Sequence, residues 1–187
     1  MAPLTCVNHV LRRQFGVIRL AQLKADGFST EAVRHLVRTE RLRRLYPGVF
    51  AAEGWADSPQ QRALAAVFAC GPTAALSHLS AAVHWRLLKY PPSLPQLTVR
   101  GTSGAKGPRG VDLHHARQLE TTVYERIPVT TLPRTLNDIA PTLRPHVLKA
   151  AVRQAEIQHR LDLSTLEPKP ALRTFLNNYV SVLVVLW

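Results

Sequence analysis

Cysteine is scarce in this sequence, which has two cysteines among 187 residues. Cys6 and Cys70 are far apart and belong to no Cys-x-x-Cys pair, so the sequence indicates neither a disulfide scaffold nor a thiolate metal site. A reducing cytoplasm is therefore the expected compartment.

Long apolar runs are also missing. Arg12 and Arg13 interrupt any signal-like apolar core near the N-terminus, and no segment reaches the roughly 20 residues of a membrane span. The final stretch, Tyr179 to Trp187, is apolar but only about half that length. We expect it to form a buried terminal element or a ragged end, and we expect no membrane association.

Acidic residues are few as well, with 12 Asp and Glu against 24 Lys and Arg, which gives a net charge of +12. The sequence is 46% hydrophobic, too apolar for a disordered basic tail, so a folded binder of polyanions is the natural class. Arginine outnumbers lysine, and its planar fork can grip phosphate or guanine with two hydrogen bonds. A high-GC codon bias would give the same composition, so charge alone does not establish DNA binding.

Residues 15–52 show the clearest local pattern, which predicts two short helices, a basic third helix and an arginine-edged hairpin. Val17, Leu20 and Ala21 are spaced as on one helical face, and Gly27 is placed to end that helix in a left-handed conformation. Ser29, two residues later, is placed to cap the start of the next helix. The short connection predicts a helix-turn-helix.

The third helix is predicted to be amphipathic. Val33, Leu36 and Val37 share its apolar face. The polar face that this leaves outward comprises Thr30, Arg34, His35 and Arg38.

A hairpin is predicted from Arg41 to Phe50. Pro47 and Gly48 supply the residues of a tight turn, in which glycine can take positive φ. Arg41, Arg43 and Arg44 lie along its first strand. Helices and hairpin together predict a winged helix-turn-helix that binds duplex DNA; the alternative is a solvated basic face on a small helical domain.

We expect an α+β fold in two domains, a winged helix-turn-helix at residues 1–54 and a small mixed α/β domain at residues 55–187. The boundary is placed at residues 54–58, before a helix capped by Ser58 and ended by Gly71. The elements expected after it are a helix capped by Ser77, strands at residues 96–100 and 111–115 joined by a hairpin loop, an extended segment from Ile127 leading into a helix opened by Pro133, a helix from Pro145 to about Arg160, and a last short helix capped by Ser164.

No catalytic, metal or cofactor site is expected. Ser77 and His78 are adjacent, and neighbouring side chains on a helix do not face each other. His114 and His115 alternate across a strand, so they cannot share one face as metal ligands. The loop between the two expected strands lacks the phosphate-cradling Gly-x-x-x-x-Gly-Lys order, although its Lys106 and Arg109 are candidates for a second phosphate contact.

Five stretches carry a family resemblance by their order along the chain: Gly16–Leu23, Ser29–Leu36, Arg41–Phe50, Leu76–Ala82 and Pro128–Ala140. Together they resemble the AbiEi-type antitoxins, DNA-binding antitoxins of abortive-infection toxin-antitoxin systems, and the actinobacterial proteins built on the same plan. The resemblance implies a cytoplasmic regulator that binds operator DNA through an N-terminal winged helix, followed by a region concerned with regulation or with antitoxin action on a cognate toxin. The DNA contacts that it implies fall on Ser29, Thr30, Arg34, His35, Arg38, Arg41, Arg43 and Arg44.

The sequence departs from this family toward its C-terminus. Many such proteins continue into a very-short-patch-repair-like endonuclease domain with a metal-binding Asp and Glu-x-Lys core, for which this chain has no room. Its only Glu-x-Lys, Glu167 to Lys169, contains a proline that a central strand would not accept. The stretch after Asn178 also departs from the family, as in a truncated or frame-shifted member.

Two other functions stay open at this point. One is a metal-dependent endonuclease related to the fused proteins, although the few acids are scattered. The other assigns residues 58–187 mainly to protein interaction, with DNA binding secondary.

Overall fold

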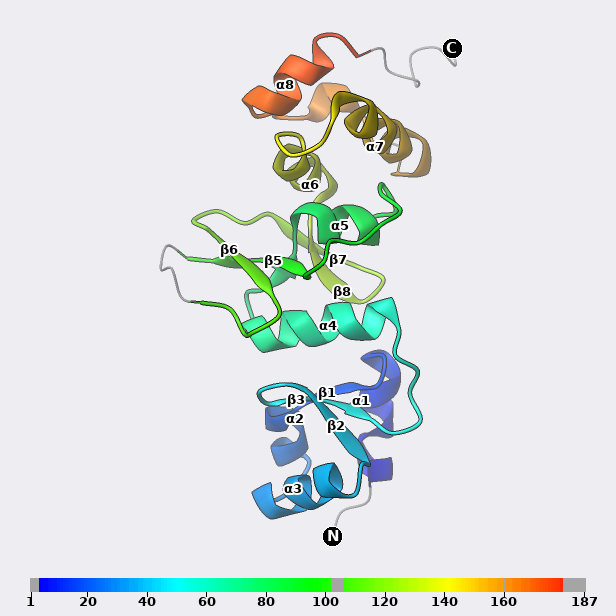
Figure 1. The fold of residues 1–187 in the computed structure, drawn as a ribbon, viewed down its shortest axis with the longest axis vertical. Coiled ribbons are helices and arrows are strands. Elements are labelled where there is room, and N and C mark those ends of the chain that lie inside the picture. The colour runs from blue at the N-terminus through cyan, green and yellow to red at the C-terminus, as the bar shows by residue number, and fades with distance from the viewer. Residues whose placement is uncertain (1–3, 102–105, 160, 180–187) are drawn as a thin grey trace.

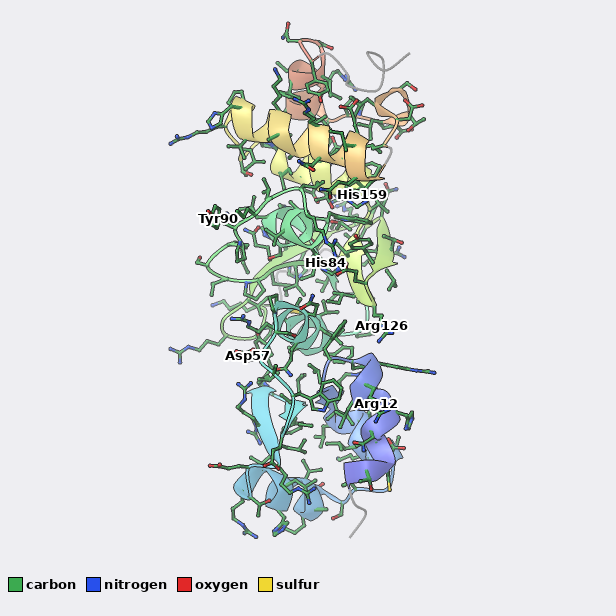
Figure 2. The ribbon with its side chains drawn as sticks, turned by 90° about the vertical axis from the view of Figure 1, so that its right-hand side faces the viewer. Arg12, Asp57, His84, Tyr90, Arg126 and His159 are labelled. Atoms are coloured by element: carbon green, nitrogen blue, oxygen red, sulfur yellow. The ribbon has the colours of Figure 1, made fainter. Side chains whose placement is uncertain are left out.

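Two β-sheets in separate stretches of the chain organise this computed structural model, which describes residues 4–101, 106–159 and 161–179 (Figure 1). The N-terminal elements are η1 (Leu4–Val7), α1 (Asn8–Arg13), β1 (Val17–Arg19), α2 (Leu20–Ala25), α3 (Thr30–Arg38), β2 (Leu42–Tyr46) and β3 (Val49–Ala52). The elements that follow are α4 (Pro59–Cys70), β4 (Ala75–Leu76), α5 (His78–His84), β5 (Gln96–Arg100), β6 (Asp112–Ala116), β7 (Thr121–Tyr124), β8 (Ile127–Thr130), α6 (Leu132–Ile139), α7 (Pro145–His159), η2 (Leu163–Thr165) and α8 (Pro170–Leu176). The fold is mixed α and β, as the sequence predicts.

The molecule is elongated (Figure 1). The three-stranded sheet, in the order β1-β3-β2, lies with α1, α2 and α3 near one end, and α4 lies between it and the five-stranded sheet. Helices α6, α7 and α8 occupy the other end. None of the described helices is long and apolar enough to cross a membrane.

The N-terminal helices differ in part from the prediction. Val17 belongs to strand β1 and pairs with Ala51, so the helix does not include it and begins at Leu20. Contacts with distant residues favour the strand over the helix at this position. Val17 is fully buried between β3 and α4, where a β-branched residue in a strand packs well. The first of the three helices, α1, also precedes residue 15 rather than following it.

The third helix and the hairpin form as predicted. Ser29 Oγ accepts a hydrogen bond from the backbone N–H of Ala32 (3.1 Å) and so caps α3. Strands β2 and β3 are antiparallel, and Gly48 in their turn has a φ of +73°. The pairing register shifts between Arg44 and Tyr46, which accounts for the imperfect alternation in the sequence.

The sheet of the second region is mixed, with strand order β6-β5-β4-β8-β7. Strands β5 and β6 are parallel, so the predicted hairpin loop between them is wrong: the chain must cross back along the sheet before β6 begins. Gly107 belongs to this crossover, and a Cβ there would lie 2.8 Å from Leu113 Cβ, so the returning chain passes close over β6.

Two predicted caps in this region are also wrong. Ser77 precedes α5 but its side chain makes no cap; instead Gln96 Oε1, from β5, accepts a hydrogen bond from the backbone N–H of Leu79 (2.9 Å). Ser164 lies within η2, which Asp162 caps through the backbone N–H of Ser164 (2.8 Å). The helices predicted after Ser58, at Pro133 and from Pro145 are present, and Arg160 and Val180 to Trp187 lie outside the described residues.

Candidate nucleic-acid interface

Helix α3 presents a polar face to solvent because its apolar face packs on the N-terminal core. Val33 and Leu36 are 3% and 2% exposed and pack in one cluster with Leu23 and Phe50. Three of the four residues predicted to face outward, Thr30, Arg34 and Arg38, are exposed, and His35 is half-buried. Ser29, the cap, is also exposed. The structure thus gathers these five candidate contacts on one helix.

The two arginines of α3 lie one helical turn apart and have different partners. Arg34 Nη1 donates to Glu31 Oε2 (3.1 Å), and the two side chains are 71% and 75% exposed. Arg38 Nη2 lies 3.1 Å from His35 Nδ1. An exposed ion pair such as Arg34–Glu31 contributes about 0 to 1 kcal/mol and breaks readily, so the Arg34 guanidinium remains available to a larger partner. Arg38 is exposed as well.

The arginines of the hairpin do not all face the same way. Arg44 pairs with Phe50, and its guanidinium carbon lies 5.9 Å from the centre of the Phe50 ring, on the sheet face that packs against α3. Arg43 pairs with Ala51, whose other neighbour in the sheet is Val17, on the face toward α4. Successive strand residues point to opposite faces, so Arg43 and Arg44 do not share one side of the sheet.

The hairpin of β2 and β3 closes in a tight turn. Its turn contains only Pro47 and Gly48, and the carbonyl of Gly48 accepts a hydrogen bond from the backbone N–H of Leu20 (2.8 Å). The turn is thereby tied to the first residue of α2. The basic residues lie on the strand itself and not on an extended loop.

The junction beyond the hairpin has mixed charge. A cleft of about 500 Å³ there has Arg43, Arg44, Glu40 and Glu53 in its lining, with Trp55 beside them. Glu53 also lies 4.0 Å from Nε of Arg41. The exposed arginines of α3, Arg34 and Arg38, lie outside this cleft.

Comparison with protein families bears directly on this region. Residues 7–52 match the family model described as transcriptional regulator, AbiEi antitoxin. The match runs from the last residue of η1 to the end of β3 and contains the eight candidate DNA contacts from Ser29 to Arg44, whereas Lys106 and Arg109 lie outside it. We refer to residues 7–52 as the AbiEi region.

The other comparisons are less informative. No curated protein matches the chain. Among solved structures, the chain is similar to the crystal structure of the RV2827C protein from Mycobacterium tuberculosis, with 16% sequence identity, 97% of this chain and 84% of that chain covered, and a TM-score of 0.48.

Outside the AbiEi region, a polar cluster lies between the second sheet and α5. Ser77 Oγ is 2.9 Å from His78 Nδ1, a contact that the sequence argument from helical neighbours excluded. It forms because Ser77 is extended and precedes the helix, while His78 has a φ of +49°. The His78 ring stacks on His114 of β6, with ring centres 4.0 Å apart. His78 and His114 are far apart in the sequence, and no local pattern indicates that their rings meet.

Burial, followed by the nearby His114 ring, lowers the pKa of His78. Asp112 and Asp138 oppose this shift, and Arg134 adds to it. Among the described residues, no group of three or more His, Cys, Asp and Glu side chains is placed to hold a metal ion. The cluster is a stacked histidine pair with Asp112 3.5 Å from Nε2 of His114.

Arg134 and Asp138 form an ion pair on α6. Arg134 Nε donates to both carboxylate oxygens of Asp138 (2.9 and 3.0 Å), and Nη1 donates to Glu120 Oε2 (2.8 Å). The hydrogen bond from Arg134 lowers the pKa of Glu120. The arginine thus joins α6 to the segment before β7, and its role in the fold is structural.

Proposed function

We propose that this protein is a sequence-specific DNA-binding transcriptional regulator of antitoxin type. The observation that carries the proposal is the exposed basic face of α3, which lies in a helix-turn-helix within the AbiEi region. The net charge of +12 adds a general attraction to the DNA backbone.

Helix α3 would lie in the major groove. Arg34 and Arg38, one turn apart, are the proposed base readers, since a bidentate arginine contact to guanine discriminates by about 1–3 kcal/mol. Ser29 and Thr30 complete the proposed contact face of the helix, and His35 lies beside Arg38 on the same helix.

The hairpin arginines have a different proposed role. Arg41, Arg43 and Arg44 would contact phosphates, or the adjacent minor groove in the case of Arg44. Such contacts add affinity with little dependence on sequence.

The proposed partner of the whole protein is operator DNA together with a cognate toxin, on which the antitoxin would act directly or indirectly. The name of the matching family supports the toxin partner. Co-expression of the full chain with the product of the neighbouring gene tests it. Growth rescue by an Arg34→Ala/Arg38→Ala variant that no longer represses would assign antitoxin action to residues outside α3; absence of rescue by the unaltered chain would contradict an antitoxin role.

The experiment for DNA binding is selection from random duplexes by the full-length protein, read by sequencing. We expect one enriched motif whose affinity falls steeply with salt, because arginine contacts to phosphate release counterions. Enrichment of no motif, or recovery without salt dependence, would contradict the proposal.

The endonuclease alternative gains no support from the structure. Glu167 and Lys169 lie in the segment between η2 and α8 rather than on a strand. Nicking of supercoiled plasmid that requires magnesium or manganese would nevertheless overturn the regulator proposal.

A further inference from the structure

His35 and Arg38 are joined by a hydrogen bond whose direction is fixed by chemistry. Arg38 Nη2 lies 3.1 Å from His35 Nδ1. A guanidinium can only donate, so Nδ1 must carry the lone pair. The neutral ring therefore holds its proton on Nε2, and His35 acts as the acceptor for Arg38.

This contact distinguishes Arg38 from its neighbour on the same face. Arg34 is paired with the carboxylate of Glu31, which offsets its charge locally. The acceptor for Arg38 is uncharged, and no carboxylate within 4 Å of Arg38 is found among the described residues. Arg38 is thus held in one direction while its full positive charge stays available.

The geometry leaves Arg38 enough donors to read a base. Arginine has five N–H groups, of which His35 engages one. A bidentate contact to guanine needs two parallel N–H groups from the same fork. The His35 side chain is half-buried, whereas the Arg38 side chain is exposed. The ring is therefore held more firmly than the guanidinium.

We propose that His35 is a positioning residue for Arg38, and that it sets base specificity through this arginine rather than by touching DNA itself. The effect on base specificity rests on the proposed function. The positioning of Arg38 rests only on its contact with His35. A loosely held arginine can reach several bases or phosphates, whereas an oriented one favours a single geometry, because less conformational freedom is lost on binding.

The test compares two substitutions in the full-length protein. His35→Leu removes the acceptor, whereas His35→Asn keeps an acceptor oxygen close to the place of Nδ1. The probes are the duplex enriched by selection and a scrambled duplex of equal length. We expect His35→Leu to weaken binding of the enriched duplex by about fivefold or more without changing the scrambled one, and His35→Asn to retain most of the preference.

A double-mutant cycle separates positioning from direct contact. In an Arg38→Ala background, His35→Leu should have no further effect on the ratio of the two affinities. A loss of similar size in that background would mean that His35 contacts DNA itself and would overturn the proposal.

The geometry is tested separately from DNA binding by nitrogen NMR of the His35 ring in the free protein near neutral pH. We expect the proton on Nε2 in the unaltered protein and a shifted Nδ1 signal in Arg38→Ala. A proton on Nδ1, or no response to Arg38→Ala, would overturn the positioning role even if DNA binds. If the selection yields no motif while NMR gives the expected result, the proposed function fails and the contact stands.

Discussion

Gln61, in the first turn of α4, donates a 3.0 Å hydrogen bond from Nε2 to the main-chain oxygen of Phe15. Gln61 is 1% exposed, so the bond is shielded from water. Phe15 has a φ of +53° in the bend that leads into β1. The helix between the two sheets is thereby fixed to the start of the three-stranded sheet.

Removing this hydrogen bond should weaken the fold. We expect Gln61→Leu to lower the free energy of unfolding by about 1 kcal/mol, because the carbonyl of Phe15 is left unpaired. The effect stays moderate because Oε1 of Gln61, which is buried without a partner, is removed at the same time. Urea denaturation measures the change. Gln60→Leu, on the adjacent and more exposed residue, should change stability by less than about 0.5 kcal/mol, and an equal loss in both variants would contradict this role for Gln61.

Gly16 and Gly27 both have positive φ, but only Gly16 lies against Trp55. Alanine substitutions at the two glycines therefore separate the packing of Trp55 from backbone strain. Gly16 has a φ of +79°, and a Cβ there would lie 2.4 Å from Trp55 Cγ. Gly27 has a φ of +84° and nothing within 4 Å of such a Cβ. Gly27→Ala should therefore cost about 1–2 kcal/mol from backbone strain alone. Gly16→Ala should cost more, because Trp55 must also move.

Thermal unfolding of both variants tests the difference. Adding Trp55→Ala to Gly16→Ala should recover part of the loss if the clash is its cause. Equal destabilisation by the two glycine substitutions would show that Trp55 does not pack on Gly16 in solution.

The cap of α3 should matter for both stability and DNA affinity. Ser29→Ala removes the hydrogen bond to the N–H of Ala32 and should cost about 1 kcal/mol, whereas Ser29→Gly should cost only a few tenths. We expect DNA affinity to fall in the same order as stability, with the preference between duplexes retained. Circular dichroism melting measures the stability, and gel shifts measure the DNA affinity. A change of preferred sequence in Ser29→Ala would instead indicate a base contact by Ser29.

The helices of the N-terminal region could be predicted where the chain signals its own structure. Ser29, Ser58 and the periodic apolar residues of α3 act within a few residues of sequence, and the structure shows both caps. Val17 was misassigned because its strand pairing with Ala51 depends on a segment more than 30 residues away. Residue propensity and the spacing of apolar residues carry no information about a pairing partner so far along the chain.

The structure of residues 55–187 could be predicted less well from sequence, because it too depends on contacts between distant segments. Gln96 caps α5 from a neighbouring strand, and β5 and β6 run parallel, so both features depend on topology rather than on local residues. The eight candidate DNA contacts could be named from sequence, but not the opposite facing of Arg43 and Arg44, which follows from the register of β2 against β3. Their contacts with DNA remain a prediction.

The histidine pair should make stability depend on pH. Because its folded pKa is lowered, His78 binds a proton more readily in the unfolded chain, so stability rises with pH and is lost as pH falls through the ordinary histidine value of about 6.5. The charged and titratable groups near it are His114, Asp112, Asp138 and Arg134. We expect the unfolding free energy to decline as the pH falls from 7.5 to 5.

Replacing His78 should reduce this dependence on pH. His78→Asn removes the titrating group, and asparagine tolerates the positive φ at this position. Urea denaturation at several pH values measures the slope. His146→Asn, at an exposed position of α7, is the control and should leave the slope unchanged. A slope in His78→Asn equal to that of the unaltered protein would contradict the assignment.

The central claim is that α3 reads DNA sequence while the hairpin arginines add affinity. Gel-shift titrations of Arg38→Ala and Arg43→Ala against the selected and the scrambled duplex test it most directly. We expect Arg38→Ala to lose about 1–3 kcal/mol of binding to the selected duplex and far less to the scrambled one, and Arg43→Ala to weaken both alike. Equal losses on the two duplexes for both variants would contradict the claim.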